Sequence, residues 1–430
     1  MSSLQVIVIG AGAAGLMAAG QAALGGAKTL LLEKMERPAR KLRITGKGRC
    51  NFTNTLPLME FLDRFGAGKK FLRPAFARFF SSELIAFFET LNIPTVIERG
   101  GRVFPAENRA QDIVDALIRW AHKCGVKIQT QSPVKKIVIE NGRIKGAELD
   151  LSASRRERFI PADAVILATG GASYPATGST GDGYRMAQEA GHSIIPIRPA
   201  LVPLETAGNV AERLAGLALR NVAARVFING KKRLEAFGEL EFTPSGVSGP
   251  IILAFSRRIV DALRMGEKVR ISIDLKPALD EEKLKARLLR DMEKFGKQPF
   301  LSALKGLLPS ALIPVCAAQT GIPLKKTSSQ ITPTEQKRLR DWLMDFSLDI
   351  INHRPFEEAL ITAGGVDTRE VNPNTMSSRI VENLYFAGEI LDIDGDTGGF
   401  NLQAAFSTGW LAGRSVCARP QPLSDCKGED

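Results

Sequence analysis

Val6-Ile-Val-Ile-Gly10-Ala-Gly12-Ala-Ala-Gly15 is the stretch from which the architecture of this chain follows. The β-branched run before Gly10 predicts a buried parallel strand, because other elements cover both faces of such a strand. Residues 16–24 then carry Ala and Leu at helical spacing, and a second apolar run at 29–32 ends at Glu33. The order of strand, glycine turn, helix, strand and acid is that of a dinucleotide-binding unit.

Each glycine of this turn is needed for a different physical reason. Gly10 permits the tight turn, Gly12 lets backbone N–H groups approach a pyrophosphate, and Gly15 lets the helix lie close to the strand. The helix N-terminus offers its unpaired N–H groups and positive dipole end to the phosphates. Glu33, eighteen residues after Gly15, is placed to accept hydrogen bonds from a ribose 2′-hydroxyl. The place at the start of the chain favours FAD, although the fingerprint alone separates neither FAD from NAD nor a ligand site from close helix–strand packing.

The composition is that of a globular enzyme. The chain has 430 residues, 44% of them hydrophobic and 24% charged, which allows about two or three domains. It contains no apolar run of about eighteen residues and no signal peptide before the first strand, so we expect a cytoplasmic protein with no membrane partner. Five cysteines without a C-x-x-C pair and only three histidines indicate neither a disulfide framework nor a metal site.

The net charge of +12 is a further clue to partners. A strongly basic protein favours an anionic partner such as RNA, a nucleotide or a membrane surface. A basic, solvated exterior is the plainer explanation, and the sequence does not separate the two.

Four later stretches extend the pattern of strands that end in polar or glycine-rich turns. Residues 37–49 carry six cations and no acid, in an ordered loop that would follow the ribose-binding acid along the cofactor. Residues 164–171 predict a buried strand that opens into glycines, and ligands of doubly wound sheets lie beyond such strand ends. Residues 359–366 predict a strand entering a glycine turn. A strand at 384–389, a glycine turn and a helix at 403–416 would bring a second helix N-terminus to the cofactor.

The middle of the chain has a different character, with proline breaks between short elements. Strands are expected at 200–206, 220–228, 232–241 and 269–275, and helices at 281–295, 310–319 and 334–345. We therefore expect a discontinuous FAD-binding domain of residues 1–195 and 354–418. An inserted substrate-side domain of residues 196–353, part antiparallel β and part helical, would interrupt it.

Six motifs support one resemblance that covers nearly the whole chain. They are the Gly10 fingerprint, Thr45-Gly-Lys-Gly-Arg-Cys-Asn-Phe-Thr-Asn54, Gly101-Arg-Val-Phe-Pro105, the loop 177–184, Ser245-Gly-Val-Ser-Gly-Pro250 and the stretch 388–399. In these motifs the chain resembles the YhiN/BaiN-like family of bacterial FAD-dependent flavoproteins, also called the aminoacetone-oxidase family. The resemblance implies an α/β fold: a Rossmann-type FAD-binding domain of the two-dinucleotide-binding-domain flavoprotein type, with an inserted β-barrel-like and helical domain.

The resemblance also implies the positions of the FAD contacts. They are Gly10, Ala11, Gly12, Ala13, Ala14, Gly15, Glu33, Lys41, Gly46, Asn51, Val134, Thr169, Gly388, Gly398, Gly399, Phe400 and Asn401. Further candidates for cofactor binding lie in the same loops: Lys34, Arg49, Gly170, Glu389 and Asp394.

The activities attached to this family are diverse: oxidation of a small amine, reduction of a conjugated steroid double bond and reduction of a uridine in ribosomal RNA. We expect a reductase that passes a hydride from NAD(P)H through FAD to a conjugated C=C bond, with a uridine in ribosomal RNA as one substrate. The chain has no second GxGxxG, so NAD(P)H would bind transiently. The alternatives are an oxidase of a small amine such as aminoacetone that uses oxygen, and an RNA-binding flavoprotein with little catalysis. In either RNA case the insertion would supply Arg213, Arg220, Arg225, Lys231, Lys232 and Arg233.

Three residues are candidates for catalysis. Arg49 could stabilise negative charge on the substrate or flavin, or it could make a pyrophosphate or structural contact. Cys50 could donate a proton, or it could be a small buried thiol. Tyr174, in a glycine-rich loop, could be a general acid or a packing residue.

Overall fold

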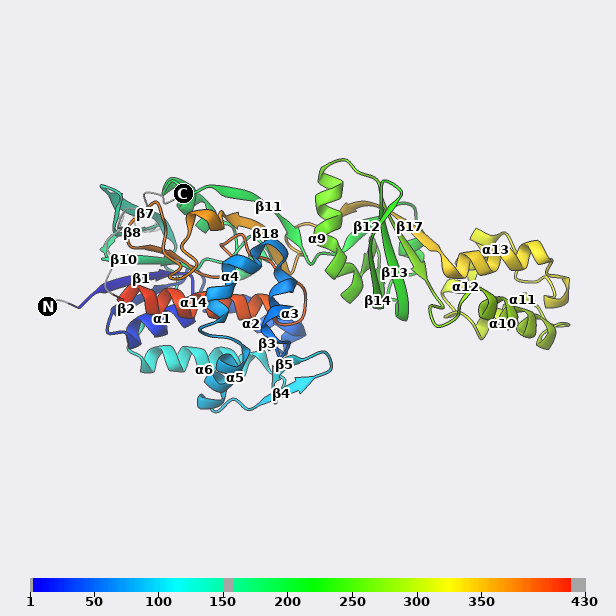
Figure 1. The fold of residues 1–430 in the computed structure, drawn as a ribbon, viewed down its shortest axis with the longest axis horizontal. Helices are drawn as coiled ribbons and strands as arrows, with labels where there is room; N and C mark the ends of the chain where they lie inside the picture. The colour runs from blue at the N-terminus through cyan, green and yellow to red at the C-terminus, as the bar shows by residue number, and fades with distance from the viewer. Residues whose placement is uncertain (1–2, 151–157, 419–430) are drawn as a thin grey trace, which may run out of the picture. The chain divides into compact units, whose positions relative to one another are not determined.

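The structure is a computed structural model that describes residues 3–150 and 158–418, so Cys426 lies outside the described part. The chain forms two compact units. One contains residues 1–198 and 360–430, and the other contains residues 199–359 (Figure 1). We call them the sheet unit and the barrel unit.

A five-stranded parallel sheet forms the centre of the sheet unit. Its strand order is β19 (Leu384–Phe386), β10 (Ala164–Leu167), β1 (Gln5–Ile9), β2 (Lys28–Leu32) and β6 (Lys127–Gln129). The apolar run of β1 is buried because it pairs on both sides: Ile7 lies opposite Val165 of β10 and Leu30 of β2. The first strand therefore occupies the middle of the sheet, as its composition predicts.

Two helices from opposite ends of the chain, α1 (Ala13–Leu24) and α14 (Phe400–Cys417), pack against each other beside this sheet (Figure 1). Glycines on α14 allow the close approach. A Cβ at Gly409 would lie 2.4 Å from the carbonyl oxygen of Ala14, and one at Gly413 would lie 2.3 Å from that of Ala18. The N-terminus of the last helix therefore lies in the same unit as the first helix.

The remaining elements of the sheet unit surround this core. A two-stranded sheet joins β11 (Ile194–Ala200) to β18 (Ile361–Val366). The glycine turn expected after residue 363 is not a turn, because Gly364 and Gly365 lie inside β18. The other bounds are α2 (Arg40–Ile44), β3 (Thr53–Asn54), α3 (Leu58–Leu62), α4 (Lys69–Phe76), α5 (Ser81–Thr90), β4 (Thr95–Glu98), β5 (Arg102–Pro105), α6 (Ala110–Lys123), β7 (Val134–Glu140), β8 (Arg143–Leu149), β9 (Arg158–Pro161) and α7 (Asp182–Glu189).

The barrel unit is built on a closed six-stranded barrel. Its strand order is β12 (Leu204–Thr206), β15 (Gly246–Ser248), β14 (Lys231–Thr243), β13 (Ala218–Ile228), β16 (Val269–Asp274) and β17 (Phe346–His353). A helix that the sequence reasoning missed, α9 (Pro250–Arg264), packs on this barrel and starts with proline at its first position. The prediction of one strand at 200–206 is also wrong, because β11 ends at Ala200 and β12 starts only at Leu204.

A helical lobe completes the barrel unit. It contains α10 (Glu281–Lys294), α11 (Phe300–Lys305), α12 (Leu312–Thr320) and α13 (Pro333–Met344). Its buried leucines share one hydrophobic core with the barrel strands. The expected fold class, a Rossmann-type α/β domain with a barrel and helical insertion, is confirmed.

Candidate functional site

The carboxyl ends of four parallel strands continue side by side beyond the sheet. The N–H of Gly10 donates to the carbonyl oxygen of Leu32 at 2.8 Å, and the N–H of Ala168 donates to that of Ile9 at 2.9 Å. The N–H of Ala387 donates to the carbonyl oxygen of Leu167 at 2.9 Å. The segments that follow β1, β2, β10 and β19 therefore start from one sheet edge. We call this region the sheet edge, and ligands of doubly wound folds bind at such an edge.

The three fingerprint glycines differ in what surrounds them. Gly10 has φ +99°, and a Cβ there would lie 2.6 Å from the carbonyl oxygen of Ala168. A Cβ at Gly15 would lie 1.8 Å from the carbonyl oxygen of Gly10, whereas one at Gly12 would meet no atom within 4 Å. Gly10 and Gly15 thus serve packing. The open side of Gly12, next to the N-terminus of α1, fits a pyrophosphate.

Glu33 is held by backbone N–H groups at the end of β2. Its Oε2 accepts a hydrogen bond from the N–H of Ala11 at 2.9 Å, and its Oε1 accepts one from Met35 at 2.8 Å. The N–H of Ser132 donates to the carbonyl oxygen of Glu33 at 2.9 Å, so the start of β7 at Val134 follows closely along the same segment. The carboxylate is fixed beside the glycine turn, where a ribose-binding acid is required.

The side chain of Lys34 turns to the second glycine-rich loop. Its ammonium group forms an ion pair with Asp182 and a hydrogen bond with Thr180. These contacts help to lower the pKa of Asp182 below its usual value, against the opposing effect of its partial burial. In this structure Lys34 therefore joins two loops of the sheet unit.

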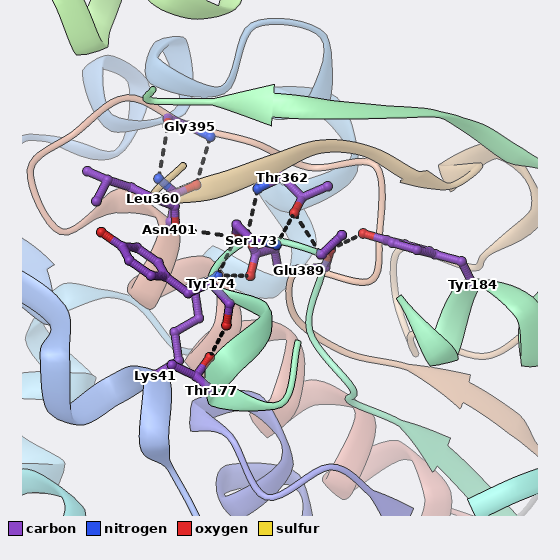
Figure 2. A network of polar contacts seen from close by, with 11 residues as sticks. Lys41, Ser173, Tyr174, Thr177, Tyr184, Leu360, Thr362, Glu389, Gly395 and Asn401 are labelled. Atoms are coloured by element: carbon purple, nitrogen blue, oxygen red, sulfur yellow. Dashed lines mark hydrogen bonds and ion pairs between the residues drawn. The ribbon is translucent and has the colours of Figure 1, made fainter. Parts of the chain in front are cut away.

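A polar network connects Lys41 with Glu389, two residues from opposite ends of the chain (Figure 2). The ammonium group of Lys41 lies 2.7 Å from Oε2 of Glu389 and 2.6 Å from the hydroxyl of Ser173. Oε1 of Glu389 accepts hydrogen bonds from the Ser173 hydroxyl at 3.1 Å and from the N–H of Thr362 at 2.8 Å. The hydroxyl of Thr362 in turn accepts the N–H of Ala172 at 2.8 Å.

This network adds hydrogen bonds to a partly buried ion pair. The side chains of Lys41 and Glu389 are only 23% and 20% exposed, so both charges need partners. The sequence reasoning named Lys41 and Glu389 but missed Ser173, Thr362 and Tyr184. Tyr184 donates to the carbonyl oxygen of Glu389 at 3.3 Å, and burial raises the pKa of its phenol.

The glycine turn before α14 lies against β3. A Cβ at Gly399 would lie 2.3 Å from the carbonyl oxygen of Thr53, and Nδ2 of Asn54 donates to the carbonyl oxygen of Gly398 at 3.1 Å. Asn401 holds the turn, since its Oδ1 accepts the N–H of Gly395 at 2.8 Å. Loops from both ends of the chain thus meet at this place.

Two buried polar atoms in this region fit a bound polar ligand. Within the described residues, Oδ1 of Asn51 and Oγ1 of Thr169 have no hydrogen-bond partner. Buried polar atoms without partners are rare in native proteins because each one costs free energy. Both residues are expected FAD contacts, and cofactor groups could satisfy them. Gly46, with φ +57°, and Gly170, with φ +73°, shape the same two loops.

Asp394 lies in the turn next to another acid. Burial, followed by the neighbouring Asp394 carboxylate, raises the pKa of Asp392, while Arg198 opposes this effect. Among residues 3–150 and 158–418, no group of three His, Cys, Asp or Glu side chains could hold a metal ion. The same part of the chain contains no helix long and apolar enough to cross a membrane.

Arg49 makes structural contacts. Its guanidinium group forms an ion pair with Glu98, donates to Asn108 at 2.9 Å and lies 4.2 Å from the ring centroid of Phe104. This ion pair holds the pKa of Glu98 below its usual value. Of the two roles weighed for Arg49, these contacts match the structural one.

The other two catalytic candidates also have defined surroundings. Cys50 is fully buried with φ +59°, and burial raises the pKa of its thiol to about 12, so it stays protonated. Tyr174 is half-buried with φ +51°, and its carbonyl oxygen accepts the Thr177 hydroxyl at 2.7 Å. Figure 2 shows Tyr174 close to the Lys41 network.

The fold and the sheet edge define a class: a Rossmann-type, FAD-dependent oxidoreductase. Residues 4–415 match the family described as HI0933-like protein Rossmann domain, and the chain belongs to this family. The resemblance to YhiN/BaiN-like flavoproteins is thereby confirmed, and FAD is the cofactor.

Two full-length relatives have named activities. The chain is 33% identical over 416 residues to the 3-dehydro-bile acid delta(4,6)-reductase of Clostridium scindens, covering 96% of this chain and 99% of the relative. It is 31% identical over 418 residues to the ribosomal RNA dihydrouridine synthase of Escherichia coli, covering 97% and 99%.

Solved structures share the fold at low sequence identity. A flavocytochrome c3 fumarate reductase matches with a TM-score of 0.52 and 17% identity, over 97% of this chain and 78% of that one. The 3-ketosteroid-delta4-(5alpha)-dehydrogenase of Rhodococcus jostii matches with a TM-score of 0.52 and 16% identity, over 97% and 98%.

Proposed function

We propose that this protein reduces a C=C bond conjugated to a carbonyl group. The proposal rests on one observation: the substrates named for the two relatives contain the same kind of bond. A 3-dehydro bile acid with delta(4,6) unsaturation has C=C bonds conjugated to a ketone, and dihydrouridine forms when the C=C bond next to a uracil carbonyl is saturated. Both relatives align over nearly the whole chain, so the shared chemistry has a common scaffold.

The residues of the sheet edge fit the binding of the cofactor for this reaction. When bound, FAD supplies the hydride chemistry. Gly12 leaves room beside the N-terminus of α1 for a pyrophosphate, and Glu33 presents its carboxylate to a ribose. Lys41 donates two of its ammonium N–H groups to Glu389 and Ser173, which leaves a third that could reach an anionic group of the cofactor.

The proposed electron donor is NAD(P)H, bound transiently. The sequence has a single GxGxxG, at Gly10 to Gly15, and FAD takes that site. A nicotinamide cofactor would therefore need to reach the flavin without a second dinucleotide fold.

The proposed natural substrate is a uridine in ribosomal RNA. Two observations favour it over a steroid: two full-length relatives are named for that reaction, and the chain carries a net charge of +12. Because nucleic-acid phosphates attract cations, a basic protein suits a polyanionic substrate. Such a substrate also fits the cytoplasmic location expected from the sequence.

The proposal is tested by anaerobic flavin reduction followed by reoxidation. The FAD-loaded protein is mixed with NADH or NADPH, and the flavin absorbance is followed. The reduced protein is then mixed with 2-cyclohexen-1-one, with cyclohexanone as the matched saturated control, or with ribosomal RNA lacking dihydrouridine. We expect at least one nicotinamide to bleach the flavin, and the enone and the RNA to restore it faster than cyclohexanone does.

Two outcomes would contradict the proposal. If dithionite-reduced protein is reoxidised by neither the enone nor the RNA, conjugated C=C reduction is wrong. If aminoacetone reduces the flavin and air then reoxidises it with release of hydrogen peroxide, the protein is an amine oxidase. If neither NADH nor NADPH reduces the flavin but the enone still reoxidises the dithionite-reduced protein, only the proposed electron donor is wrong.

A further inference from the structure

Two turns of the barrel unit are joined at one end of the barrel. One turn connects β13 to β14 at Asn229 and Gly230, and the other connects α9 to β16 at 265–268. The N–H of Asn229 donates to the carbonyl oxygen of Lys268 at 2.9 Å, and the N–H of Lys268 donates to Oδ1 of Asn229 at 3.0 Å. Asn229 and Gly230 have φ +48° and +77°, as a two-residue hairpin turn requires. The pair of turns is therefore an ordered unit.

Exposed cations surround this pair of turns. Arg233 is placed by a bulge: Val226 lies opposite Leu234 and Phe227 opposite Lys232, so Arg233 has no partner in the strand ladder. Within the described residues, four exposed cationic side chains here have no ion pair or hydrogen bond: Lys231, Arg233, Arg264 and Lys268. We call these four residues the double-turn surface.

Other cations of the same barrel are neutralised. The guanidinium group of Arg225 lies 2.9 Å from Glu235 and 3.6 Å from Asp274, and Lys232 lies 2.9 Å from Glu235. Two of the six insertion cations expected to contact RNA, Arg225 and Lys232, are thus already paired with acids. Lys231 and Arg233, two of the remaining four, keep their charges open at the double-turn surface, while Arg213 and Arg220 are exposed elsewhere in the barrel unit.

We propose that the double-turn surface binds the phosphate backbone of the RNA substrate. This inference rests on the proposed function, since it assigns part of the barrel unit to holding a ribosomal RNA. Unpaired cations on an ordered turn gain from phosphate contacts because binding releases the counterions of the nucleic acid.

The composition of the surface favours RNA over a lipid membrane. Binding to a membrane surface depends on apolar area buried at the interface as well as on charge. Met265, which is 78% exposed, is the one large exposed hydrophobic residue within the turn at 265–268. The turn at 265–268 has one acid, Glu267, which accepts a hydrogen bond from Asn229, so the four cations leave a positive charge that suits a polyanion.

The test compares two variants of the full-length, FAD-loaded protein with the same change in charge. The first is Lys231→Gln, Arg233→Gln, Arg264→Gln and Lys268→Gln. The control is Lys297→Gln, Lys305→Gln, Lys325→Gln and Lys337→Gln, four exposed cations of the helical lobe. The probe is a fluorescein-labelled, uridine-rich single-stranded RNA of bacterial ribosomal sequence. Its fluorescence anisotropy is measured over a range of salt concentrations.

We expect the first variant to bind this RNA at least tenfold more weakly than the wild type. Its slope of log affinity against log salt should fall by about 3, since each lost contact to single-stranded phosphate contributes about 0.7. The control variant should stay within about twofold of the wild type. Circular dichroism and thermal unfolding should be the same for all three proteins, because these exposed side chains form no hydrogen bond or ion pair within the described residues.

Three results would overturn the inference: no salt-dependent RNA binding by the wild type, equal losses in the two variants, or unchanged RNA binding by the first variant together with loss of binding to phosphatidylglycerol vesicles. Reduction of 2-cyclohexen-1-one without RNA separates this inference from the proposed function. The first variant should keep that activity, and its absence in the wild type would reject the reductase while leaving the RNA measurement valid.

Discussion

The sheet edge and the double-turn surface hold their charges in opposite ways. At the sheet edge, Lys41 and Glu389 are 348 residues apart in sequence, and each side chain is about four-fifths buried. At the double-turn surface, cations in and beside two short turns are exposed and have no partner among the described residues. The first arrangement exists only when the sheet unit is folded, because buried charges require every partner in place. The second is a local property that a substitution can remove without affecting the fold.

The largest effect is expected where the sheet edge is most tightly packed. Gly15→Val places side-chain atoms against the carbonyl oxygen of Gly10, since even a Cβ would lie 1.8 Å away. Overpacking against backbone should cost about 3 kcal/mol or more of the free energy of unfolding. Urea unfolding of the purified variant measures this loss. A variant as stable as the wild type would show that the close approach of α1 to the glycine turn is wrong.

The neighbouring Gly12→Val is the matched test of cofactor binding. A Cβ at Gly12 meets no protein atom within 4 Å, so the free energy of unfolding without FAD should change by less than about 0.5 kcal/mol. The added side chain occupies the place of the pyrophosphate, and the affinity for FAD should fall about 100-fold, or about 2.7 kcal/mol. Equilibrium titration with FAD and urea unfolding report the two quantities separately. If the variant binds FAD as tightly as the wild type does, Gly12 does not lie at the cofactor site.

A smaller effect is expected for the buried ion pair. Glu389→Gln leaves the ammonium group of Lys41 mostly buried without a carboxylate, and the free energy of unfolding should fall by about 2 kcal/mol. The control is Glu189→Gln, which breaks an ion pair with Arg185 whose side chains are 49% and 50% exposed. That pair should contribute at most about 0.5 kcal/mol. Equal losses in the two variants would contradict the difference between buried and exposed pairs described above.

The smallest effect concerns His192, a buried residue of the sheet unit. Burial lowers its pKa below the ordinary value of 6.5, partly offset by the nearby Glu370. The unfolded chain therefore binds the proton more readily, so stability is present above about pH 6.5 and is lost as the pH falls below it. The wild type should lose about 1 kcal/mol more than His192→Gln between pH 7 and pH 5, measured by urea unfolding. Parallel pH profiles would contradict the assignment.

Sequence was sufficient where the information is local. The glycine spacing and Glu33 lie within one βαβ unit, and hydrogen bonds between its own residues confirm the geometry, such as that from Ala11 to Glu33. The amphipathic helices α10 and α13 were predicted to within a few residues for the same reason. Their positions depend on patterns that repeat along one element.

Sequence was insufficient where distant segments approach each other. Gly364 and Gly365 look like a turn, but they lie within β18. They are glycines because neighbouring backbone comes very close: a Cβ at Gly364 would lie 2.6 Å from the carbonyl oxygen of Pro196, and one at Gly365 would lie 2.6 Å from that of Ile390. The partnership of Lys41 with Glu389 and the buried state of Cys50 have the same origin. No local pattern indicates which residues 190 to 350 positions apart will meet, as Thr362 and Ala172 do.

The most direct test of the central claim, that one FAD binds at an edge built from both ends of the chain, is hydrogen–deuterium exchange with and without FAD. The backbone amides of residues 10–16, 46–54, 169–171 and 388–402 should exchange more slowly when FAD is bound. The barrel amides at 218–243 should change much less. Protection confined to the barrel, or unchanged exchange at both the first and the last of the four segments, would contradict the claim.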